Sequence, residues 1–122
     1  MAYQDLRQFL WALEGHGLLR RVQREVDADW EISAVCRVAF QTIPPPHRPA
    51  LLFERIKGHT IPVVVGAIGG SRATYALALD IAPADLTRRV ASVWADAIAH
   101  PVEPRNVARG ACQENVVQGD AV

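Results

Sequence analysis

The chain has 122 residues, of which 50% are hydrophobic and 21% are charged; this balance is typical of a folded domain and excludes a disordered chain. Its 13 basic and 13 acidic side chains cancel to a formal net charge of zero, whereas a protein held on nucleic acid by phosphate contacts normally carries a basic excess. No apolar run approaches the roughly 20 residues of a membrane-spanning helix, and the first residues lack the pattern of a signal peptide. We expect a single small cytoplasmic domain that binds neither nucleic acid nor a membrane.

The first predicted element is an amphipathic helix. Its apolar residues recur every three or four positions, at Leu6, Phe9, Leu10 and Leu13. Asp5 is a suitable N-cap and Gln8 completes a capping-box pattern, while Gly15 and Gly17 end the helix. Residues 18–22 then form a short predicted strand.

A second amphipathic helix is predicted to begin at Asp27 or Asp29 and to continue to about Phe40. Its apolar stripe consists of Ile32, Val35, Cys36, Ala39 and Phe40. Acidic residues around its start favour capping and complement the helix dipole. The stripe places Cys36 in the core as a small hydrophobic residue rather than a reactive thiol. The proline-rich segment 44–49 ends the helix and forms a stiff connector.

Two β-rich runs follow, at residues 51–56 and 61–65. The short glycine-containing connection 57–60 favours an antiparallel hairpin between them. Pro62 fits only the beginning or the unpaired side of its strand. The continuous apolar run 63–65 predicts burial on both faces of the sheet.

The segment Gly66–Arg72 is rich in glycine and precedes a helix that is predicted to reach Leu79, with Ser71 as its cap. A strand, a glycine-rich turn and a capped helix have the general form of an anion cradle. However, the Gly-Lys-Ser/Thr of a phosphate loop is missing, so a tight chain reversal is favoured over anion binding. Arg72 is the charge in this segment that would assist an anion.

The last predicted helix covers residues 84–99. Its apolar stripe consists of Leu86, Val90, Val93, Trp94, Ala97 and Ile98, and Arg88 and Arg89 belong to its solvated face. Residues 1–101 then form one α/β domain of the α+β type, with a mixed sheet and a β-hairpin packed against amphipathic helices. Residues 102–122 form a connecting tail, in which 112–117 has the pattern of a strand.

Residue chemistry alone identifies no catalytic, cofactor-binding or metal-binding residue. The four histidines fall in turns or at helix ends and lie outside metal-ligand spacing: His16, His47, His59 and His100. Cys36 and Cys112 lie far apart, which favours free thiols in a reducing compartment. The patterns of acyl-transfer enzymes and glycosidases are missing as well.

The order of segments nevertheless matches a known pattern along the whole chain. The matching segments are 5–10, 17–22, 26–32, 49–58, 61–63, 70–72, 76–79 and 111–120. In this order they resemble the N-terminal domain of UbiD-type decarboxylases, with 111–120 similar to the segment that leads into the cofactor domain. Each motif alone is weak, and their order carries the resemblance.

The resemblance implies a role in reversible decarboxylation of aromatic or α,β-unsaturated carboxylic acids. Complete family enzymes use prenylated flavin mononucleotide with a divalent metal, Mn²⁺ or Mg²⁺, and often K⁺. The family's cofactor and catalytic residues lie outside the matched segments, so the resemblance assigns none here and leaves open whether the chain is itself an enzyme.

Three explanations fit the short chain: a piece of a longer enzyme, a short subunit that works with a separate catalytic chain, or a stand-alone protein. The first two predict an accessory or scaffold domain, partnered by a catalytic domain or subunit or assembled as a homo-oligomer. The third predicts a small binding or protein-interaction module without catalysis.

Overall fold

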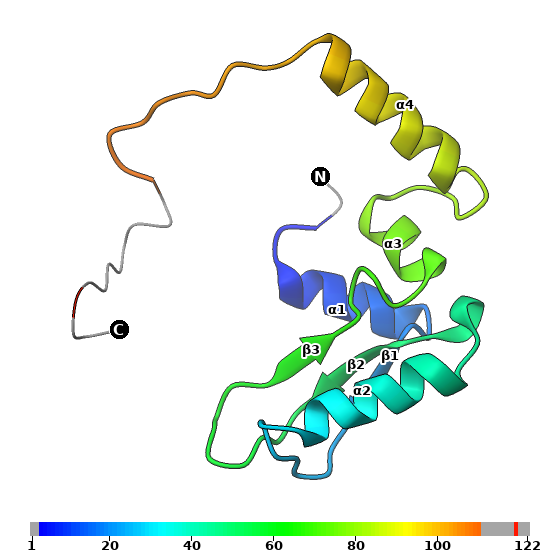
Figure 1. Ribbon diagram of the computed structural model, residues 1–122, viewed down its shortest axis with the longest axis vertical. Coiled ribbons are helices and arrows are strands. Elements are labelled where there is room, and N and C mark those ends of the chain that lie inside the picture. Colours follow the sequence, from blue (N-terminus) through cyan, green and yellow to red (C-terminus); the bar gives the residue numbers. More distant parts are fainter. Residues whose placement is uncertain (1–2, 111–118, 120–122) are drawn as a thin grey trace. The chain divides into compact units, whose positions relative to one another are not determined.

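The computed structural model describes residues 3–110 and 119 (Figure 1). In chain order the elements are α1 (Leu6–Gly15), β1 (Leu19–Val22), α2 (Glu31–Thr42), a 3₁₀ helix (Pro45–His47), β2 (Ala50–Phe53), β3 (Val63–Val65), α3 (Arg72–Ala78) and α4 (Leu86–Ala99). The contacts within the chain divide it into two units, Met1–Ala91 and Ser92–Val122. The predicted boundary after residue 101 stays a prediction, and the predicted strand at 112–117 lies outside the described residues.

The sheet has three strands in the order β1-β2-β3, and its two pairings have opposite senses. β1 pairs with β2 in parallel, with Leu19 opposite Ala50 and Val22 opposite Phe53. β2 pairs with β3 antiparallel, with Leu52 opposite Val64. The predicted mixed sheet and hairpin are therefore confirmed, in strands shorter than expected.

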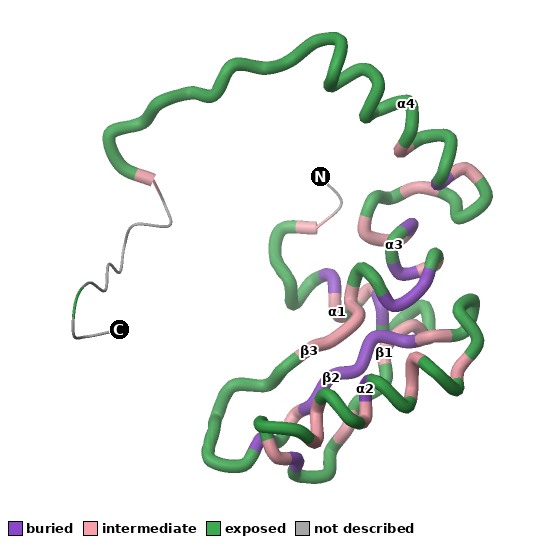
Figure 2. The backbone as a smooth tube through the Cα atoms, in the orientation of Figure 1, coloured by how far each residue is buried: buried purple, intermediate pink, exposed green. Residues whose placement is uncertain are grey.

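Helices pack on both faces of this sheet because neighbouring residues of a strand point to opposite faces. One face packs against α2, in a core of Val26, Cys36, Leu51, Phe53 and Ile56. The other face packs against α1 and α3, around Phe9, Leu13 and Ala50. Figures 1 and 2 show the result: β2 is buried along its length between α2 and the α1 and α3 pair.

The prediction that Val63, Val64 and Val65 are buried on both faces is wrong. Val63 is 36% exposed, and the other two residues are half-buried. β3 is an edge strand of the described sheet, whereas the equally apolar β2 has a strand on each side and helices on both faces. An apolar run thus identifies a strand here, but its place in the sheet decides its burial.

The predicted N-cap of α1 is confirmed, but the capping-box pattern is not, because the Gln8 side chain bonds to the N–H of Gln4 rather than to that of Asp5. The carboxylate of Asp5 accepts a hydrogen bond from the backbone N–H of Gln8 at 2.8 Å, and the Gln8 side chain accepts one from the N–H of Gln4 at 2.7 Å. The chain reverses after the helix through Gly17, whose φ of 68° favours glycine. Leu13 is fully buried, but Leu6 is 54% exposed, so the stripe is covered only from its second turn onward.

The predicted start of α2 at Asp27 or Asp29 is wrong, because the helix begins at Glu31. The Asp27 carboxylate accepts a hydrogen bond from the N–H of Asp29 at 2.8 Å and thereby stabilises a turn before the helix. Trp30 takes the N-cap position. The helix ends at Thr42, just before the prolines that were predicted to end it. As predicted, Cys36 lies on its buried stripe.

Candidate functional site

The glycine-rich loop at Gly66–Arg72 is the first candidate site, and its backbone closes on itself. The N–H of Gly70 donates to the carbonyl oxygen of Gly66 at 3.0 Å. A Cβ on Gly70 would lie 2.6 Å from that oxygen, and a Cβ on Gly66 would lie 2.9 Å from the ring of Phe40. Gly66 also has a φ of 74°. These glycines are needed for a tight chain reversal packed against α2, as the sequence favoured.

The polar groups at the start of α3 bond to one another. The hydroxyl of Ser71 accepts a hydrogen bond from the N–H of Thr74, and the Thr74 hydroxyl accepts one from the N–H of Ser71, both at 3.1 Å. Both side chains are buried. Arg72 donates to the carbonyl of Pro83 at 3.3 Å and to the hydroxyl of Thr87 at 3.1 Å. The N–H groups of Ser71 and Thr74 thus cap α3, and one guanidinium nitrogen of Arg72 holds the connection that follows it.

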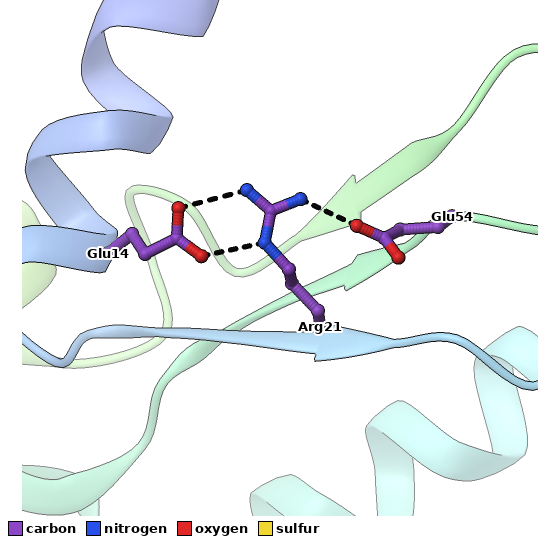
Figure 3. A network of polar contacts seen from close by, with 3 residues as sticks. All are labelled: Glu14, Arg21 and Glu54. Atoms are coloured by element: carbon purple, nitrogen blue, oxygen red, sulfur yellow. Dashed lines mark hydrogen bonds and ion pairs between the residues drawn. The ribbon is translucent and has the colours of Figure 1, made fainter.

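A charged cluster that the sequence did not indicate centres on Arg21 of β1 (Figure 3). Its guanidinium donates two hydrogen bonds to Glu14, at 2.6 and 2.9 Å, and a third to Glu54 at 2.5 Å. These bonds raise the pKa of Arg21 and lower the pKa of Glu14 from their ordinary values. Both groups stay charged at neutral pH, so the cluster ties α1 to the sheet and is not a proton-transfer site. The packing of α1 beside β1 and the parallel register of β1 and β2 bring the three side chains together.

A shallow apolar pocket of about 440 Å³ lies where the start of α2 meets the hairpin. Its lining consists of Ala28, Ile32, Ser33, Ile56, His59, Ile61 and Val63. The size falls within the range of small-molecule sites, but the polar groups in the lining side chains are limited to one hydroxyl and one imidazole. Two segments that are far apart in the sequence, 28–33 and 56–63, form the lining, which is why sequence patterns did not reveal it.

The histidines and the described cysteine also lack the arrangement of a reactive site. Nδ1 of His16 lies 2.8 Å from the carbonyl oxygen of Ala12, and Nδ1 of His100 lies 3.0 Å from the carboxylate of Asp96. Burial raises the pKa of the Cys36 thiol, which keeps it protonated. Within residues 3–110, no three His, Cys, Asp or Glu side chains form a group able to hold a metal ion. The described helices include none long and apolar enough to cross a membrane.

Comparisons with known proteins identify the relatives of this chain. Residues 10–94 match the family described as the 3-octaprenyl-4-hydroxybenzoate carboxy-lyase N-terminal domain. A phenolic acid decarboxylase from Sedimentibacter hydroxybenzoicus is 36% identical over 124 residues, which cover 97% of this chain and 25% of that protein.

Solved structures agree with the sequence match. The closed form of the vanillic acid decarboxylase of S. hydroxybenzoicus superposes with a TM-score of 0.71 at 36% identity, over 97% of this chain and 25% of that one. An evolved dimeric form of the UbiD-class enzyme HmfF from Pelotomaculum thermopropionicum, in complex with prFMN, gives a TM-score of 0.62 at 35% identity, over 84% and 22%. The chain thus spans about a quarter of the length of these relatives. It belongs to the family of UbiD N-terminal domains.

Proposed function

We propose that this chain is the N-terminal accessory module of a cytoplasmic UbiD-class carboxy-lyase that decarboxylates aromatic or α,β-unsaturated acids. The observation that carries the proposal is the match of 97% of the chain to a quarter of a phenolic acid decarboxylase, within a family defined by the N-terminal domain. In this proposal the remaining three quarters supply the chemistry, as a continuation of the polypeptide or as a partner subunit. The module supplies a folded scaffold.

The donor chemistry of the described residues supports a scaffold role. The glycine-rich loop is closed by its own hydrogen bonds, and Arg72 is bonded to the segment that follows α3. These groups do not fit a flavin phosphate and its metal ion, so we assign no described residue to prenylated FMN, Mn²⁺, Mg²⁺ or K⁺. We place those groups in the complete enzyme. Residues 1–101 form the module, and residues 102–122 lead toward the cofactor domain.

A hybrid polypeptide tests the proposal. This chain replaces the matched N-terminal quarter of the S. hydroxybenzoicus decarboxylase, and the hybrid is supplied with prenylated FMN, Mn²⁺ and K⁺. We expect it to decarboxylate vanillic acid, while the same enzyme without its N-terminal quarter and this chain alone show no turnover.

Two outcomes would contradict the proposal. A folded hybrid without turnover would show that this chain does not act as an N-terminal module of such an enzyme. Turnover by the isolated chain would show that it carries its own active site. An isolated chain that binds a small apolar ligand in the pocket at Ile32 and His59, together with an inactive hybrid, would favour the stand-alone binding module.

A further inference from the structure

The helix α4 carries an apolar stripe that extends beyond the described core. Leu86 at its start is buried and Val90 is half-buried, whereas Val93, Trp94 and Ile98 are 57%, 66% and 75% exposed. Figure 2 shows most of the helix as exposed. We call the residues that continue the stripe the α4 apolar face: Val90, Val93, Trp94, Ala97 and Ile98.

Two charged side chains on the polar side of α4 pair with residues that flank the helix. Arg88 pairs with Asp85 at 2.8 Å, and Asp96 contacts His100 at 3.0 Å. These contacts suit a side that faces water. An amphipathic helix with such a polar side is stabilised mainly by packing of its apolar side, because a helix this short is marginal alone in water. The α4 apolar face therefore needs a cover.

The area of the α4 apolar face limits the kind of protein surface that can bind it. An aromatic side chain buries about 150–250 Å² when fully covered, so the three exposed side chains offer on the order of a few hundred Å². Two separately diffusing proteins need about 800 Å² each for a stable interface. The face is thus too small to hold two copies of this chain together by itself. A small face is sufficient when a tether or a larger contact elsewhere supplies a high effective concentration.

We propose that the α4 apolar face docks onto the portion of a UbiD-class decarboxylase that follows the N-terminal domain. The inference rests on the proposed function and adds to it the surface through which the module is held. The match to these relatives covers 97% of this chain but only about a quarter of their length, and the matched family is an N-terminal domain, so most of each relative lies outside the matched part. Trp94 is the expected anchor, because exposed aromatic side chains at the centre of a face dominate binding.

Hydrogen exchange on the hybrid enzyme and on the isolated chain tests this surface. We expect the amides of residues 92–99 to exchange at least about tenfold more slowly in the hybrid than in the isolated chain, because docking suppresses opening of the helix. Residues 50–53 of β2 serve as the internal reference and should be protected in both. Trp94→Glu should abolish the added protection at 92–99 in the hybrid. The matched control is Ala95→Glu, which adds the same charge to the same helix on the side away from the stripe.

The outcomes separate the surface from the function. An active hybrid in which 92–99 exchanges as fast as in the isolated chain, or in which Trp94→Glu leaves the exchange unchanged, overturns the docking face but leaves the proposed function in place. A folded, inactive hybrid with protection at 92–99 overturns the function and supports the docking face. Protection of 92–99 in the isolated chain overturns the docking face, and gel filtration then distinguishes a second copy from cover within the chain.

Discussion

The helices α1 and α2 differ from α4 in burial, although all three have the same kind of sequence. Each carries apolar residues every three or four positions. Leu13 of α1 and Cys36 of α2 are buried against opposite faces of the sheet, whereas Ile98 of α4 is 75% exposed. An apolar stripe indicates that a helix packs against another apolar surface. Whether the described chain provides that surface depends on which strands lie beside the helix. The position of α1 and α2 beside β1 and β2 supplies it.

The largest expected effect separates α1 from α4 directly. Leu13→Ala should lower the free energy of unfolding by about 2–5 kcal/mol, because it leaves a cavity at a fully buried position. Ile98→Ala in the isolated chain should change it by less than about 0.5 kcal/mol, as expected for an exposed side chain. Urea unfolding of the two variants measures both. Equal shifts of the midpoint would show that the α4 face is covered in the isolated chain.

The second prediction tests how far along α4 the apolar side chains are buried. Leu86→Ala should cost about 2 kcal/mol, at the lower end for leucine, because Leu86 is buried but lies close to the end of the unit Met1–Ala91. Val93→Ala, on the same stripe, should be close to neutral in the isolated chain. The same urea titration compares them. A loss for Val93→Ala as large as that for Leu86→Ala would extend the covered part of the stripe beyond the first turns.

A smaller effect is expected at the start of α3, a helix of seven residues that depends on its cap. Ser71→Ala should cost about 1 kcal/mol, because the N–H of Thr74 loses its acceptor in a buried position. Ser92→Ala within α4 is the matched control and should not destabilise the chain, since alanine favours helix interiors. Thermal unfolding of both variants is the measurement. Equal melting temperatures for the two would exclude a stabilising role for the capping box.

The smallest expected effect concerns the charged cluster that ties α1 to the sheet. Its hydrogen bonds from Arg21 lower the pKa of Glu14 in the folded chain, so the folded state binds this proton less readily than the unfolded state. The stabilisation is therefore present above the ordinary glutamate pKa of about 4.3 and is lost as the pH falls through the lower folded value. Wild type should lose more stability than Glu14→Gln between pH 7 and pH 3.

Urea midpoints at the two pH values test that difference, with Glu103→Gln as a control for an exposed carboxylate outside the cluster. Glu103→Gln should follow the wild type. A Glu14→Gln curve that runs parallel to that of the wild type would show that the contacts in Figure 3 contribute nothing to stability.

The sequence predicted helix ends correctly where the capping hydrogen bonds involve only neighbouring residues. Asp5 and Ser71 cap their helices as expected, because a cap needs only the first turn that follows it. The start of α2 was missed because Asp27 has two local options, a helix cap and a turn with Asp29, and the structure takes the turn. The candidate site followed the same rule. The closed glycine-rich turn was predicted, whereas the Arg21 cluster and the apolar pocket needed contacts between distant segments.

The sequence by itself determined the kind and order of the elements, the hairpin, the buried stripe of α2 and the resemblance to UbiD N-terminal domains, because these depend on periodicity and on short motifs. The tertiary structure decided which apolar residues are covered. β2 and β3 are both continuously apolar, yet Phe53 is fully buried and Val63 is 36% exposed. Burial depends on what lies on each side of a residue: β2 is covered by β1, α1 and α2, which come from segments outside the hairpin, whereas β3 has a neighbouring strand on one side only in the described sheet.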